Sequence, residues 1–155
     1  MSNSPKQIAE SFYLAFQKKS AESMCVLYSD TILFSDPVFP KLAGEAARNM
    51  WRMLCQNSTD LKIDYRVLFS SDKSAVVEWN AWYTFSKTGR KVHNIVHSTL
   101  EVEDGLIVKH TDLFSFWRWS RQALGIPGIC LGWTPLLKGK VQETAAKSLL
   151  KFSRN

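Results

Sequence analysis

The sequence has few cysteines and no long run of apolar residues. Its three cysteines, Cys25, Cys55 and Cys130, are odd in number and far apart, and no two have CxxC spacing. This pattern indicates neither a disulfide framework nor a zinc site, and it favours a reducing compartment. The opening residues lack the apolar run of a secretion signal, and no stretch approaches the length of a membrane helix. We therefore expect a cytoplasmic protein with no membrane partner.

Acidic residues are scarce in the last third of the chain. The 155 residues carry a net charge of +6, and residues 109–155 alone hold eight basic and two acidic side chains, which is the whole excess. A basic tail can indicate an anionic partner, but no run of basic residues and no aromatic RNA-binding motif accompanies it. We interpret it as a solvated lysine face and expect no nucleic-acid partner.

The first part of the chain shows helical signals. Ser4 and Pro5 suit an N-cap and a first helical position, and Ile8, Phe12 and Phe16 then recur at helical spacing. Similar spacing predicts further helices over residues 20–28, 45–56 and 137–152. The last of these has an apolar stripe opposite its lysines, which is typical of a helix that covers its own domain.

Strand signals begin at residue 61. Alternating β-favouring residues, separated by tight turns, predict strands over residues 61–70, 75–87, 92–103 and 106–118. Consecutive hairpins of this kind make an antiparallel meander. We expect a glycine-rich loop after Trp119.

The order of these elements predicts an α+β fold in one domain over residues 1–155. We expect a cone-shaped, curved antiparallel sheet packed on three N-terminal helices, with an extra C-terminal helix. The core would span about residues 5–119, and the C-terminal loop and helix residues 120–155. A bent sheet around a long helix would enclose an apolar cavity.

Asp36 is the most informative residue for function. It follows an apolar strand, precedes Pro37, and is flanked by Phe34, Val38 and Phe39. Apolar surroundings disfavour the charged carboxylate, which is how a carboxyl becomes an acid or base near neutral pH. The alternative is that Asp36 is an ordinary turn residue before a proline.

The chain resembles the SnoaL-like and ketosteroid isomerase-like proteins of the nuclear transport factor 2-like (cystatin-like) superfamily. The resemblance rests on the stretches IAESFYLAFQKKS, VLYSDTILFSDPVFPKLAGEAARNMW and TGRKVHNIVHSTLEVEDGLIVKHTDLFSF. It implies that Asp36 matches the general base of ketosteroid isomerases. It also implies that Phe12 and Ser98 stand where those enzymes have their two oxyanion donors. Since an oxyanion hole is usually a large catalytic contribution, we do not expect steroid isomerisation by that mechanism.

His110 and Asp112 are two residues apart on one predicted strand, so their side chains project to the same face. Histidine titrates near neutral pH. The resemblance implies a histidine–aspartate set in the cavity, so we predict Asp36, His110 and Asp112 as catalytic residues. The alternative is that His110 is a satisfied polar residue of the core and that Asp112 caps or bridges the C-terminal loop.

The resemblance and the strand alternation together predict a pocket for a small apolar or cyclic organic molecule. Its predicted ligand-binding residues are Phe12, Phe16, Tyr28, Trp51, Trp79, Tyr83, Asn94, Ser98 and Phe114. One hypothesis is an isomerase, cyclase, dehydratase or hydrolase that uses acid–base chemistry and no cofactor. The alternatives are a non-catalytic ligand-binding domain and a protein-interaction domain of the same fold.

The face of the sheet opposite the predicted cavity raises two further questions. His93 and His97 share that face, but no third metal ligand is evident, so we expect no metal site. Trp82 and Trp117 are also assigned to it. An aromatic sheet face is usually covered, and the resemblance implies a second copy, so we expect a homodimer through this face.

Overall fold

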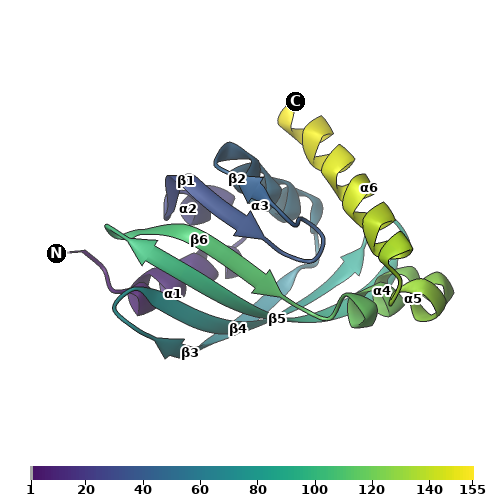
Figure 1. Cartoon of the computed structure of the whole chain (residues 1–155), viewed down its shortest axis with the longest axis horizontal. Coiled ribbons are helices and arrows are strands. Elements are labelled where there is room, and N and C mark those ends of the chain that lie inside the picture. Colours follow the sequence, from purple (N-terminus) through teal and green to yellow (C-terminus); the bar gives the residue numbers. More distant parts are fainter. Residues whose placement is uncertain (1) are drawn as a thin grey trace.

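Figure 1 shows the computed structural model, which describes residues 2–155. Its helices are α1 (Pro5–Gln17), α2 (Ala21–Cys25), α3 (Glu45–Asn57), α4 (Phe116–Leu124), α5 (Ile126–Leu131) and α6 (Pro135–Ser153). Its strands are β1 (Tyr28–Ser35), β2 (Leu42–Ala43), β3 (Lys62–Ser70), β4 (Ser74–Phe85), β5 (Arg90–Glu103) and β6 (Leu106–Leu113). The predicted α+β class and curved sheet are confirmed, and the sheet is not closed into a barrel (Figure 1).

The six strands form one sheet in the order β2-β1-β6-β5-β4-β3. β3, β4, β5 and β6 are antiparallel neighbours, as predicted for a meander. β1, however, pairs parallel to β6, so the sheet is mixed where the sequence predicted an antiparallel sheet. The connection from β1 to β6 contains α3 and four strands, β2 to β5, and no local pattern reveals a pairing over that distance.

The core lies between the concave face of the sheet and the helices α1 and α3. On β5 the buried positions are those predicted by alternation: Asn94, Val96, Ser98, Leu100 and Val102. On β4 the buried set includes Val77, Trp79 and Ala81. In β6, alternation back from Asp112 and His110 would place Val108 on the same buried face, but the register with β5 shifts between Glu101 and Val102. Ile107, and not Val108, is therefore the buried residue there.

β6 is shorter than the predicted strand. We predicted a strand over residues 106–118, but β6 ends at Leu113 and a helix, α4, follows. The hydroxyl of Ser115 accepts a hydrogen bond from the backbone N–H of Arg118 (3.2 Å). Since a capped N–H no longer needs a strand partner, Ser115 begins a helix although the aromatic residues after it favour strands.

α4 covers the part of β5 that β6 leaves unpaired. The side-chain amide of Gln122 accepts a hydrogen bond from the N–H of His93 (2.8 Å) and donates one to its carbonyl (3.1 Å). It thus replaces a neighbouring strand at an exposed edge. Trp117, which we expected beside Trp82 on a strand face, lies on α4 instead.

α5 lies where we predicted a glycine-rich loop after Trp119. It approaches α4 so closely that only glycine fits between them. A Cβ at Gly128 would lie 2.0 Å from the carbonyl oxygen of Ser120, and one at Gly132 would lie 2.1 Å from its Oγ. The glycines that suggested a loop therefore serve helix packing.

α6 packs along α3 and runs from α5 to the C-terminus (Figure 1). Of the predicted stripe, Leu149 is buried and Val141, Ala145 and Phe152 are half-buried, so this face covers the domain as expected. The amide of Gln142 donates to the carbonyl of Pro37 (3.0 Å). Within residues 2–155, none of the helices combines the length and the apolar character needed to cross a membrane.

Replacement of Gly128 by alanine should destabilise the fold by about 1–3 kcal/mol, because the new methyl group overpacks the contact between α4 and α5. The free energy of unfolding in urea measures this. Gly139→Ala is the matched control: that glycine lies in α6 with nothing within 4 Å of a Cβ. It should stabilise the protein by about 0.5–1 kcal/mol, because alanine favours helix. Equal effects of the two substitutions would contradict the packing described for α5.

Candidate active site

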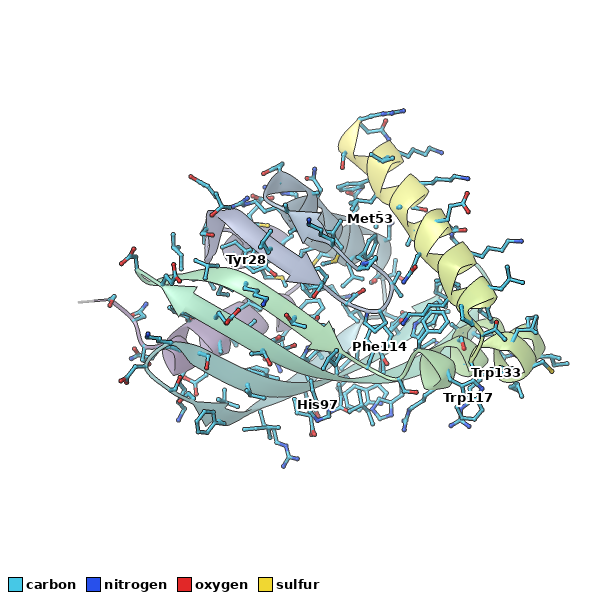
Figure 2. The ribbon with its side chains drawn as sticks, in the orientation of Figure 1. Tyr28, Met53, His97, Phe114, Trp117 and Trp133 are labelled. Atoms are coloured by element: carbon cyan, nitrogen blue, oxygen red, sulfur yellow. The ribbon has the colours of Figure 1, made fainter. Side chains whose placement is uncertain are left out.

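A cavity of about 250 Å³ lies between the concave face of the sheet, α3 and α4. Most of its wall is apolar, including Met53 of α3 and Phe114, which follows β6; both are labelled in Figure 2. Four polar wall residues matter for its chemistry: Asp36, Tyr83, Asn94 and Asp112. An apolar cavity with a few polar groups is typical of a site for a small organic molecule.

Asp36 follows β1 and begins a tight turn, and its side chain accepts hydrogen bonds from the backbone of that turn. Its Oδ1 accepts hydrogen bonds from the backbone N–H groups of Val38 (2.7 Å) and Phe39 (2.6 Å). Its own N–H donates to the carbonyl of Phe39 (2.9 Å). Oδ2 has no partner among the described residues and is left for the cavity. Burial raises the pKa of Asp36 from 3.8 to about 7, against the lowering effect of these hydrogen bonds.

The parallel pairing of β1 with β6 places Asp36 beside Asp112. Phe34 pairs with His110 and Ser35 with Thr111, so Asp36, the first residue after β1, leaves the strand next to the position of Asp112. Neighbouring strands are about 4.8 Å apart, and residues paired in parallel register face the same side. The negative charge of Asp112 contributes to the raised pKa of Asp36. The two carboxyl groups therefore form a coupled pair in the cavity wall.

His110 is fully buried behind this wall and holds Asp112 from inside. Its Nε2 lies 2.7 Å from Oδ1 of Asp112, and its Nδ1 lies 2.7 Å from the hydroxyl of Tyr28. The indole N–H of Trp51 donates to that hydroxyl (2.8 Å), so the Tyr28 proton points to Nδ1. This arrangement places an N–H of His110 at Nε2, from where it is donated to Asp112.

Ser98 holds the same oxygen of Asp112 from the neighbouring strand. Its hydroxyl donates to Asp112 Oδ1 and accepts from the indole N–H of Trp79 (2.7 Å). With Oδ1 doubly engaged, Asp112 turns Oδ2, which has no partner among the described residues, to the cavity. Tyr13 lies nearby, fully buried, and its hydroxyl makes no hydrogen bond to the residues described. Burial and then the charge of Asp112 raise its pKa well above its usual value, so it stays protonated.

Tyr83 and Asn94 supply hydrogen-bond donors to the cavity. Asn94 pairs with Ala81, so Tyr83 lies diagonally across from it on the same face. The Tyr83 hydroxyl accepts from the indole N–H of Trp119 (2.8 Å), and its own proton has no acceptor among the described residues. Burial raises the pKa of Tyr83, and the charge of Asp36 adds to the rise. The amide of Asn94 makes no hydrogen bond within residues 2–155.

The predicted site residues fall into two layers. The cavity is lined by Phe16, Asp36, Trp51, Trp79, Tyr83, Asn94, Asp112 and Phe114. The second layer lies behind the wall: Phe12, Tyr28, Ser98 and His110 are buried and do not line the cavity. The rings of Phe12 and Phe34 contact the His110 ring edge-on, at centroid distances of 5.4 and 5.1 Å.

Trp119 is a wall residue with a hydrogen-bonding role that was not predicted from the sequence. It lines the cavity from α4 and positions the Tyr83 hydroxyl. We predicted a strand up to residue 118 and a loop after Trp119, so the helix that directs Trp119 into the cavity was not expected. Ser115 as an N-cap, followed by Phe116, Trp119 and Ala123 at helical spacing, was the available signal.

The outer face of the sheet carries the remaining two histidines, and both have partners. His93 Nε2 lies 2.8 Å from Oδ1 of Asn80, and its ring stacks on Trp82. His97, labelled in Figure 2, pairs with Glu78 (3.0 Å). Within residues 2–155 no group of three or more His, Cys, Asp or Glu is placed to hold a metal ion. The homodimer through this face stays a prediction.

The raised pKa of Asp36 should make stability fall as pH rises. Between about pH 4 and pH 7 the folded protein keeps a proton that the unfolded chain has released, so the free energy of unfolding decreases over this range. Asp36→Asn removes this titration. The urea midpoint of the variant, relative to that of the wild type, should therefore increase as the pH rises from about 4 to 8. Asp30→Asn, at a fully exposed aspartate of β1, should run parallel to the wild type. Parallel curves for all three proteins would contradict the raised pKa.

Comparison with solved structures establishes the fold. A proposed polyketide cyclase from Pseudomonas putida KT2440 superposes with a TM-score of 0.69 and 14% identity, over 79% of this chain and 99% of the other. A proposed isomerase from Bacillus subtilis gives 0.63 and 18% identity, over 78% and 92%. An LEH-like epoxide hydrolase from M. tuberculosis gives 0.60 and 16% identity, over 84% and 92%. Among curated proteins, none matches the chain.

The matched family agrees with the resemblance seen in the sequence. The model of the SnoaL-like domain matches residues 9–110, which is more than half of the chain. This stretch includes Asp36 and His110 and ends just before Asp112. The chain therefore belongs to the SnoaL-like domain family.

Proposed function

We propose that this protein is an enzyme that moves a proton at a carbon next to a carbonyl group of a small, largely apolar molecule. The observation that carries the proposal is the coupled pair of Asp36 and Asp112 in the wall of an apolar cavity, with the pKa of Asp36 raised to about 7. A general base is most effective when its pKa lies near the working pH. The reaction uses groups of the protein itself.

The proposed mechanism begins at the free oxygen of Asp36. Asp36 Oδ2 takes a proton from the carbon next to the carbonyl, and the C–H electrons move into an enolate. The Tyr83 hydroxyl and the Asn94 amide donate hydrogen bonds to the enolate oxygen. The protonated Asp36 then returns the proton to another carbon, which completes an isomerisation. If the enolate carbon instead attacks a second carbonyl of the same molecule, a ring closes and Asp36 protonates the new alkoxide.

His110 takes a positioning role in this proposal. The sequence predicted His110 as a catalytic residue, but its side chain is enclosed and both ring nitrogens are engaged. Its donated hydrogen bond holds Asp112 with one oxygen toward the cavity. The charge of Asp112 in turn contributes to the raised pKa of Asp36.

Epoxide hydrolysis is a second candidate, and the adjacency of the two carboxyls favours it. A protonated Asp36 could donate its proton to the epoxide oxygen while Asp112 Oδ2 takes a proton from an attacking water. The epoxide C–O bond would break as the new C–O bond forms, giving a diol. A similar structure is that of an LEH-like epoxide hydrolase.

Deuterium exchange tests the first candidate without knowledge of the natural substrate. The protein is incubated in D₂O with a panel of cyclic ketones and enones, and deuterium uptake next to the carbonyl is followed by NMR. Asp36→Asn should lower the exchange rate at least about a hundredfold, because it removes the base. Asp30→Asn, the same change outside the cavity, should leave it unaltered.

The pH profile of exchange gives a second expected outcome. The rate should rise with pH and level off above about pH 7, since only ionised Asp36 accepts a proton. Full exchange activity in Asp36→Asn would refute the role of Asp36. If ketones bind but exchange no deuterium, the protein is a binding domain. If the protein forms diols from epoxides and catalyses no exchange, the second candidate is supported instead.

A further inference from the structure

α5 and the start of α6 carry a cluster of exposed apolar side chains. Between residues 126 and 136 five large apolar residues are 48–81% exposed: Ile126, Ile129, Leu131, Trp133 and Leu136. Trp117 of α4 is 40% exposed and adjoins them, because its indole N–H donates to the carbonyl of Ile129 (3.3 Å). We call these six residues the α5 surface. Figure 2 labels Trp117 and Trp133 at the same end of the molecule. Contiguous exposed apolar area of this kind is typical of an interaction site.

The orientation of α5 explains why its large side chains face outward. The positions that contact α4 are Gly128 and Gly132, where a Cβ would collide with Ser120. A helix that served only the core would direct its large apolar residues inward. α5 does the reverse, so its packing presents Ile126 and Ile129 to the surroundings.

The segment that carries the α5 surface is basic in sequence. Residues 113–142 contain no Asp or Glu, and they contain Arg118, Arg121, Lys138 and Lys140. Arg121 lies over the ring of Trp117, 4.6 Å from its centroid. Arg90 joins this group from β5, because its guanidinium donates to the carbonyl of Gln122 at the end of α4 (2.8 Å).

We propose that the α5 surface docks on an anionic phospholipid bilayer. Apolar side chains that enter the interface and a basic rim that attracts the headgroups are the two signals that together give stable attachment. A second copy of the chain fits less well, because a symmetric contact through this surface would bring two basic rims together. The proposal revises the sequence-based expectation of no membrane partner. That expectation rested on the lack of an apolar run long enough to span a membrane, which does not bear on docking through an exposed surface.

Docking in this way would place the cavity near a phase that concentrates apolar molecules, since Trp119 of α4 lies in the cavity wall. This consequence rests on the proposed function, whereas the docking itself does not. Vesicle binding and deuterium exchange are separate measurements, so either proposal can fail alone.

Sedimentation with sucrose-loaded vesicles tests the docking. The full chain should bind vesicles of phosphatidylcholine with phosphatidylglycerol, and much less those of phosphatidylcholine alone. Trp133→Ser with Leu136→Ser should lower the partition coefficient at least about tenfold, because two apolar side chains no longer enter the interface. Lys140→Gln should lower it about fivefold, and added salt should weaken binding of the wild type.

The control replaces an exposed apolar pair elsewhere. Leu68→Ser with Phe69→Ser changes side chains of β3 that are 45% and 61% exposed, and it should bind vesicles like the wild type. Absence of binding to anionic vesicles would overturn the proposal, and so would equal losses in both double variants. Light scattering covers the remaining case. If the wild type binds no vesicles and Trp133→Ser with Leu136→Ser lowers its particle mass, the α5 surface joins two copies and the proposal is wrong.

Discussion

The parallel pairing of β1 with β6 is the contact on which the candidate site depends. It brings the end of β1, where the chain turns through Asp36, against the strand that carries His110 and Asp112. Without it Asp36 would be a turn carboxylate facing water, with an ordinary affinity for protons. With it, Asp36 lies in an apolar wall and feels the charge of a second carboxyl. The same pairing orders the core, because Phe34 then contacts the ring of His110.

The polar groups behind the cavity explain how the protein tolerates a carboxylate in its interior. A buried charge is costly unless hydrogen bonds compensate for its lost hydration. Asp112 receives them from His110 and Ser98, whose own partners are Tyr28 and Trp79. The layer therefore stabilises Asp112 in one orientation, and its rigidity keeps the second oxygen directed at the cavity.

Periodicity predicted the strand faces well, because alternation is a local property of a strand. It placed Asn94, Ser98 and Asp112 on the concave face, where the structure has them. It did not separate the cavity wall from the layer behind it. Whether His110 faces a ligand or the ring of Phe12 depends on how α1 packs, which strand alternation does not describe.

Other features depended on long-range contacts or on competing local signals. The register shift between Glu101 and Val102 moves Ile107 inward and follows from pairing between strands. The β-favouring aromatic residues after Leu113 concealed α4, although the N-cap at Ser115 was visible in the sequence.

Titration of the Asp36 carboxyl carbon by ¹³C NMR, in the wild type and in Asp112→Asn, tests the central claim most directly. The account predicts a pKa of about 7 in the wild type and a lower value in Asp112→Asn. A wild-type value near the usual range for aspartate, or one that Asp112→Asn leaves unchanged, would contradict the coupled pair.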